Sequence, residues 1–121
     1  MTLNVAPMII KLLIHFKTPL IVPTDITYVI THISEIYNLI QGKVNKDYKA
    51  DVFDCDDFAF SFKALASRNE MNSVGIIVGK CRKEWHAWNF AVTKEHIVQI
   101  EPQTGMVFFD DLDYKPMIII I

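Results

Sequence analysis

Three residues in the second half of the chain have the types and the order that thiol-based nucleophilic chemistry requires. Cys55 is a candidate nucleophile, His86 a candidate general base and acid, and Glu101 a candidate acid that orients the imidazole. A nucleophilic thiol needs a base beside it, and the base needs a third group that holds its ring. Cys55 is also expected at the start of a helix, where the helix dipole lowers a thiol pKa and backbone N–H groups can bind an oxyanion. The sequence therefore predicts a catalytic site on Cys55, His86 and Glu101, with Trp88 beside it as a substrate contact.

An acidic run surrounds this cysteine. Negative neighbours oppose ionisation of a thiol, so the run has three interpretations: helix capping, a divalent cation that offsets the repulsion, or an inert, buried Cys55. Capping accounts well for one or two acids and poorly for four between residues 51 and 57. Carboxylate and amide oxygens suit Ca²⁺, Mg²⁺ or Mn²⁺. The aspartates of the run are Asp47, Asp51, Asp54, Asp56 and Asp57, and the candidate metal ligands are Asp56, Asp57, Glu101 and Gln103.

Length and composition limit the class of protein. The 121 residues carry a net charge of −2 and are 51% hydrophobic, which fits one globular domain over residues 1–121. The near balance of charge argues against generic nucleic-acid binding. No apolar run approaches the length of a membrane span, and the start lacks a basic leader with a cleavage site. We therefore expect no membrane or nucleic-acid partner. A cytoplasmic location is expected, with export alongside a particle or by lysis as the open alternative.

The order of the predicted elements indicates an α+β fold. Apolar residues at helical spacing predict a helix over residues 26–40, opened by Thr24 as N-cap, and a second helix over residues 55–68 behind Asp54. Two prolines argue against a long helix across residues 3–22. Strands are predicted at residues 74–78, 85–93, 97–101, 106–109 and 117–121. Helices followed by strands predict N-terminal helices packed on a C-terminal antiparallel sheet.

Hairpin geometry brings the predicted base and acid together. A two-residue loop at Lys94 and Glu95 sets Phe90 opposite Gln99, Trp88 opposite Glu101 and His86 opposite Gln103. This register puts His86 diagonal to Glu101 on one face of the sheet, within reach of a hydrogen bond. A slip by one residue would move Glu101 to the other face.

Four ordered motifs then give a family resemblance. They are DCDDFA (residues 54–59), GIIVG (residues 75–79), HAWNF (residues 86–90) and IEPQTG (residues 100–105). Together they resemble papain-like and transglutaminase-like cysteine enzymes and, more narrowly, the papain-like C-terminal domain of a mushroom agglutinin, over residues 51–109. The resemblance implies a minimal papain-like core, a protease that depends on Ca²⁺ or Mn²⁺, and a homodimer. It also implies Cys55 as nucleophile, His86 as general base and acid, and Glu101 as the orienting acid or a metal-side carboxylate. Asp56, Asp57 and Gln103, with or without Glu101, match that domain's metal ligands.

Three functions follow as hypotheses. The first is a metal-activated cysteine peptidase or amide-transfer enzyme that acts on a peptide or protein. The alternative is a catalytically inactive, metal-stabilised binding or assembly module on the same fold, such as one from a phage-type particle. The third is a metal-free globular domain with an over-capped helix.

Overall fold

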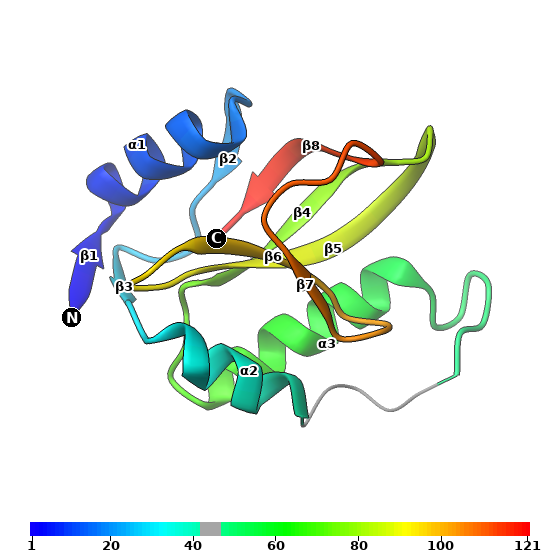
Figure 1. The fold of residues 1–121 in the computed structure, drawn as a ribbon, viewed down its shortest axis with the longest axis horizontal. Helices are drawn as coiled ribbons and strands as arrows, with labels where there is room; N and C mark the ends of the chain where they lie inside the picture. Colours follow the sequence, from blue (N-terminus) through cyan, green and yellow to red (C-terminus); the bar gives the residue numbers. More distant parts are fainter. Residues whose placement is uncertain (42–46) are drawn as a thin grey trace.

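The computed structural model describes residues 1–41 and 47–121, and it has the α+β architecture that the sequence predicts (Figure 1). A six-stranded sheet has the strand order β2-β8-β4-β5-β6-β7, and a separate two-stranded sheet pairs β1 with β3. The predicted antiparallel sheet needs one correction, because the edge strand β2 pairs in parallel with β8. The elements are β1 (Thr2–Asn4), α1 (Val5–Phe16), β2 (Leu20–Val22), β3 (Thr27–Val29), α2 (Ile33–Gln41), α3 (Cys55–Arg68), β4 (Val74–Cys81), β5 (Glu84–Val92), β6 (Ile97–Glu101), β7 (Met106–Phe108) and β8 (Tyr114–Ile120).

Helices cover both faces of the large sheet. Helix α1 lies on one face, where Met8 and Leu12 pack against Trp88 and Phe90 of β5. Helices α2 and α3 lie on the other face, and Phe62 of α3 belongs to the core there (Figure 1). Because side chains alternate between the two faces of a strand, each central strand contributes to both cores.

The central hairpin has the register that its turn predicts. Phe90 pairs with Gln99, and Val92 pairs with Ile97 across the two-residue loop. Strand β6 ends at Glu101, whose carbonyl accepts the N–H of Gly105 at 2.8 Å in the following turn. The pairing of His86 with Gln103 is therefore not formed, since Gln103 lies in that turn.

A close approach between β4 and β8 requires a glycine. The pairing of these strands shifts register between Val78 and Gly79, and Gly79 faces Pro116. A Cβ at Gly79 would collide with the backbone carbonyl of Lys115. The proline, which has no N–H to donate, is accommodated at this irregular position.

The N-terminal third differs from its prediction. Pro7 lies inside α1, in the first turn, where backbone N–H groups have no helical partner and a proline is tolerated. The single helix predicted over residues 26–40 is divided into β3 and α2. Thr24 caps neither helix, since its hydroxyl donates to the Ile121 carbonyl at 2.9 Å. Val29, one of the apolar residues at helical spacing, lies instead in β3, which pairs with β1.

Helix α3 forms where it was predicted and is tied to the sheet at two points. The Lys63 ammonium donates to the Val74 carbonyl at 2.6 Å, and burial lowers the pKa of this lysine. The Asn89 amide of β5 donates to the Ala59 carbonyl at 2.9 Å. These two contacts fix α3 relative to β4 and β5. Across the described residues, no helix has both the length and the apolar composition to cross a membrane.

Candidate functional site

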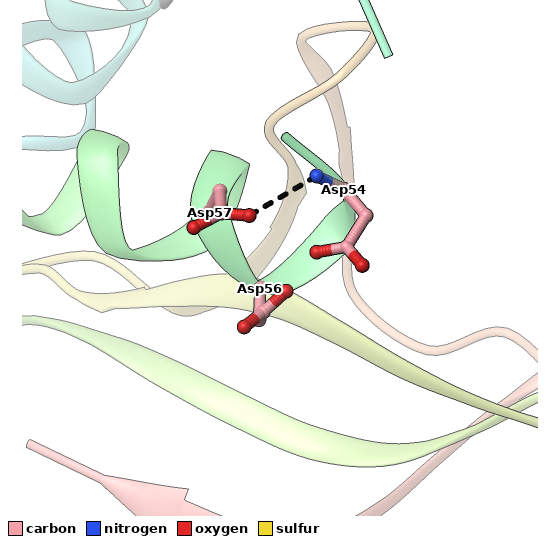
Figure 2. A group of neighbouring side chains, drawn as sticks. All are labelled: Asp54, Asp56 and Asp57. Carbon is pink, nitrogen blue, oxygen red and sulfur yellow. Dashed lines mark hydrogen bonds between the residues drawn. The ribbon is translucent and has the colours of Figure 1, made fainter. Parts of the chain in front are cut away.

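Three carboxylates gather around the first turn of α3. Asp54 is the N-cap residue, and Asp56 and Asp57 lie in the first turn, so local sequence alone brings them together. One ligand atom from each side chain lies within 4.8 Å of the others. The Asp54 N–H donates to Asp57 Oδ2 at 3.2 Å, the return bond of a capping box (Figure 2). Asp57 therefore has a capping role, whereas Asp56 is exposed on the outside of the turn.

The acids of this cluster affect one another. A hydrogen bond with the Asp56 side chain, followed by partial desolvation and the Asp56 charge, raises the pKa of Asp54 to about 6. Such a shift arises when two carboxylates approach too closely for both to ionise freely. A cation placed among the three oxygens would remove this effect, because it favours the ionised carboxylates.

The second polar group is the pair of His86 and Glu101. His86 Nε2 lies 2.8 Å from Glu101 Oε2, as the hairpin register predicts. Both side chains are largely buried, with 17% and 7% of their surfaces exposed. The Tyr114 hydroxyl donates to the same Glu101 oxygen at 3.4 Å. Burial and the Glu101 carboxylate raise the pKa of Tyr114, which keeps this hydroxyl protonated as a donor.

Aromatic packing holds this pair in place. The His86 ring stacks on Trp88 with 5.7 Å between centroids. Trp88 is fully buried, and its indole N–H donates to Gln99 Oε1 at 2.8 Å. Gln99 in turn donates to the Phe109 carbonyl at 3.0 Å. The indole therefore supports the histidine and exposes no surface to a ligand, and the substrate contact predicted for Trp88 stays a prediction.

Cys55 belongs to a different environment. It is half-buried at the start of α3 and packs against a cluster that includes Ala59 and Ala87. Alternation along β5 directs Ala87 and Asn89 toward α3 and directs His86 and Trp88 toward the other side. Within the described part of the chain, no hydrogen bond joins the Cys55 thiol to His86 or Glu101. The structure thus joins the predicted base and acid by a hydrogen bond, and the grouping of Cys55 with them stays a prediction.

The predicted metal ligands come from different elements, and their joint role stays a prediction. Asp56 and Asp57 lie together, but Glu101 is engaged by His86 and Tyr114, and Gln103 lies in the turn after β6. Asp54 joins the acidic cluster, although the predicted ligand set names only Asp56 and Asp57 from this run. Its place in the same helical turn as Asp57 is the signal that could have identified it.

The comparisons with known proteins identify the family. The model of the Agglutinin C-terminal family matches residues 28–107, which is more than half of the chain. The chain belongs to this family. A comparison with curated proteins finds no match.

Solved structures of lectins share the fold. The structure titled "PSL1a-E64 complex" has a TM-score of 0.81 and 24% identity, over 99% of this chain and 51% of that one. The Polyporus squamosus lectin bound to a human-type influenza-binding epitope, Neu5Aca2-6Galb1-4GlcNAc, has a TM-score of 0.82 and 22% identity, over 99% of this chain and 49% of that one. The chain thus spans about half the length of these lectins.

These findings correct the predicted enzyme. Membership of an agglutinin family and a fold shared with lectins contradict the prediction of a cysteine peptidase or amide-transfer enzyme. They also contradict its assignment to the hydrolases and thiol proteases. The alternative prediction of a catalytically inactive binding module fits the findings better.

Proposed function

We propose that this chain is a non-catalytic, carbohydrate-binding module of an agglutinin, stabilised by a divalent cation at the start of α3. The observation that carries the binding function is the family match over residues 28–107. The lectin fold of both solved neighbours supports it, and one of them is titled as bound to a glycan. The module keeps the papain-like core that its motifs resemble, with His86 and Glu101 serving as internal supports.

The residues at the start of α3 fit a cation. Asp54, Asp56 and Asp57 supply only oxygen ligands, which suit Ca²⁺ or Mn²⁺. Their mutual repulsion, expressed in the raised pKa of Asp54, would be relieved by positive charge. The proposed ligand set replaces Glu101 by Asp54 and retains Asp56 and Asp57. Gln103 remains a proposed fourth ligand.

The cation's contribution would be to folding. The three acids surround the first turn of α3, and Ala59 in the next turn packs against Ile76 of β4 and Ala87 of β5. An ion that binds only the folded arrangement stabilises by mass action, by about 2.7 kcal/mol when its concentration is 100 times Kd. A bound ion would thus secure the junction between α3 and the sheet.

We also propose that the module forms a homodimer through α1. Ile10 and Ile14 lie one helical turn apart and are 57% and 72% exposed. Neighbouring apolar residues with this exposure form a surface that a second copy would bury. Light scattering should report a dimer for the chain and a monomer for Ile14→Lys. A monomer in both cases would refute this part of the proposal.

A glycan array and thermal melts test the two main parts separately. The fluorescently labelled chain should retain at least one class of glycan, and binding to none would refute the carbohydrate function. In melts, Ca²⁺ or Mn²⁺ should raise the Tm relative to chelator. Asp56→Asn should remove most of this rise, whereas Asp47→Asn, an exposed acid of the same run outside the cluster, should preserve it. Equal responses of the two variants would exclude the cluster as the ion site.

A further inference from the structure

A basic pocket lies at the tip of the β4–β5 hairpin and is lined by residues other than those of the site described above. It has a volume of about 390 Å³. The tip of the β4–β5 hairpin and the segment that leads into β8, whose ribbons Figure 1 shows, supply its lining residues. The size is at the lower end of the range for small-molecule sites. Its lining residues are Lys80, Arg82, Lys83, Leu112, Asp113 and Lys115.

The charge of this pocket is unbalanced. Four of the six lining residues are cations, in a chain whose net charge is −2. The one carboxylate, Asp113, already accepts a hydrogen bond from Arg82 Nε at 3.3 Å. Lys80 and Lys115 are direct cross-strand partners, an arrangement of like charges that destabilises a sheet. Arg82 is thus paired with the carboxylate of the lining. Among the described residues that line the pocket, no further carboxylate is left for Lys80, Lys83 and Lys115.

The hairpin turn has basic residues at two positions where the backbone conformation favours asparagine and glycine. Arg82 and Lys83 have φ values of 51° and 71°, which is the left-handed region. A two-residue turn of this kind is normally built from Asn-Gly, because residues with a bulky side chain are strained there. Strain of this kind persists where the surrounding structure over-determines it, and it concentrates at binding sites.

The pocket is also held in a fixed shape. The Arg82 N–H donates to the Asp113 carbonyl at 2.9 Å, which fastens the turn to the segment before β8. The Lys80 ammonium lies 4.2 Å from the centre of the Trp85 ring, and this indole is 58% exposed. Lys80 covers one face of this indole, and the rest of the ring exposes apolar surface next to the residues that line the pocket. Positive charge beside exposed aromatic surface suits a ligand that has both an anionic group and an apolar ring face.

We propose that this pocket binds the acidic group of an anionic monosaccharide unit, carboxylated or phosphorylated. The cations bind the acid, and the exposed part of the Trp85 ring, beside the pocket, contacts the sugar ring. The inference rests on the proposed carbohydrate function and names the ligand class for it. A nucleic acid is a poorer fit, because the chain is net acidic and the positive charge is confined to one small pocket.

Three probes that differ at one carbon test the ligand class. Calorimetric titration of the full chain should give binding of glucuronic acid or glucose 6-phosphate at least tenfold tighter than binding of glucose. The two acidic probes distinguish a carboxylated from a phosphorylated ligand. The affinity should fall as salt is added. Equal affinity for glucose, or inorganic phosphate binding as tightly as glucose 6-phosphate, would overturn the proposal.

Variants test the location. The double variant Lys80→Gln with Lys115→Gln should weaken binding of the acidic probe at least tenfold, whereas Lys11→Gln on α1 should leave it unchanged. Wild-type affinity in the double variant would overturn the proposal. Arg82→Asn with Lys83→Gly offers a further check, because it installs the favoured turn residues. This variant should have a higher Tm and a weaker affinity, and a higher Tm with unchanged affinity would refute a binding role for the turn.

The outcomes also separate this inference from the proposed function. Retention of neutral glycans on the array, with no effect of the pocket variants, would refute the pocket and leave the carbohydrate function intact. Retention of no glycan on the array, together with no binding of the three probes, would refute both.

Discussion

Two tryptophans on one strand allow a matched test of the polar network that supports His86. Trp88 is fully buried, whereas Trp85 is 58% exposed, although both belong to β5. The same substitution to phenylalanine therefore removes the same atoms from two different environments. We expect Trp88→Phe to destabilise the protein strongly and Trp85→Phe to have almost no effect.

The expected magnitude follows from two contributions. Removing the indole N–H leaves Gln99 Oε1 buried without its donor, which costs about 1–3 kcal/mol. The smaller ring also leaves a void beside His86, which adds about 1–2 kcal/mol for the lost apolar contact. The sum is about 3 kcal/mol, or roughly 10 °C in Tm for a domain of this size. Trp85→Phe, at an exposed position, should change stability by less than about 0.5 kcal/mol.

Urea denaturation followed by far-ultraviolet circular dichroism measures this difference without relying on tryptophan fluorescence. The denaturation midpoint should fall for Trp88→Phe while the slope stays constant, which would show a change of stability alone. Adding Gln99→Leu should recover part of the loss, because it removes the buried acceptor that has lost its donor. The Phe109 carbonyl also loses the Gln99 amide in this variant, but it belongs to an exposed residue. A midpoint for Trp88→Phe equal to that of Trp85→Phe would refute the reasoning.

Three further predictions concern charge and packing elsewhere. Without divalent cations, the free energy of unfolding should fall as the pH rises from about 4 to about 6, because the pKa of Asp54 is raised to about 6 in the folded state and the folded chain then holds the extra proton. Asp56→Asn should flatten this dependence in thermal melts, and an unchanged slope would contradict the assigned repulsion. Gly79→Ala should cost about 2 kcal/mol or more and speed amide exchange in β8, because the new methyl group collides with the Lys115 carbonyl; protection equal to the wild type would show that the strands can separate freely. Glu95→Gln should lower the Tm at neutral pH, since this carboxylate accepts bonds from a histidine ring at 2.7 Å and from the first N–H of α2 at 2.9 Å. The pKa of Glu95 is lowered to about 2, chiefly by the histidine, so the difference should disappear as the pH falls from about 4.5 through about 2, and a difference that persists there would argue against the assigned role.

The parts of the fold that could be predicted are those fixed by local geometry. The two-residue turn after β5 determines the register of the hairpin, and the register determines that His86 meets Glu101. Helix α3 was predictable for the same reason, because its cap and its apolar stripe are contiguous in sequence. Each of these features depends on residues within one turn or one hairpin of each other.

The parts that could not be predicted depend on distant partners. The apolar residues of β3 satisfy a helical pattern, yet they pair with β1 at the start of the chain, and Ile26 is 80% exposed. Only the tertiary partner decides between these two structures. Likewise, the order of Cys55, His86 and Glu101 is that of a catalytic triad, but sequence order does not say which side of the sheet receives α3. The structure places α3 on the side of Ala87, a choice that depends on packing between distant parts of the chain.

The two proposed sites are linked by charge. A divalent cation at Asp54, Asp56 and Asp57 would change the formal net charge from −2 to 0. The uncharged complex would repel an anionic saccharide less than the free chain does, although the basic pocket at Lys80 and Lys115 is unaltered. This long-range effect acts on the rate of association and is screened beyond about 8 Å at physiological salt. Stopped-flow mixing with an acidic sugar should therefore show faster association with Ca²⁺ than with chelator at low salt, and equal rates near 0.15 M salt. A calcium effect of the same size at both salt concentrations would mean that the ion acts on the shape of the pocket and not through charge.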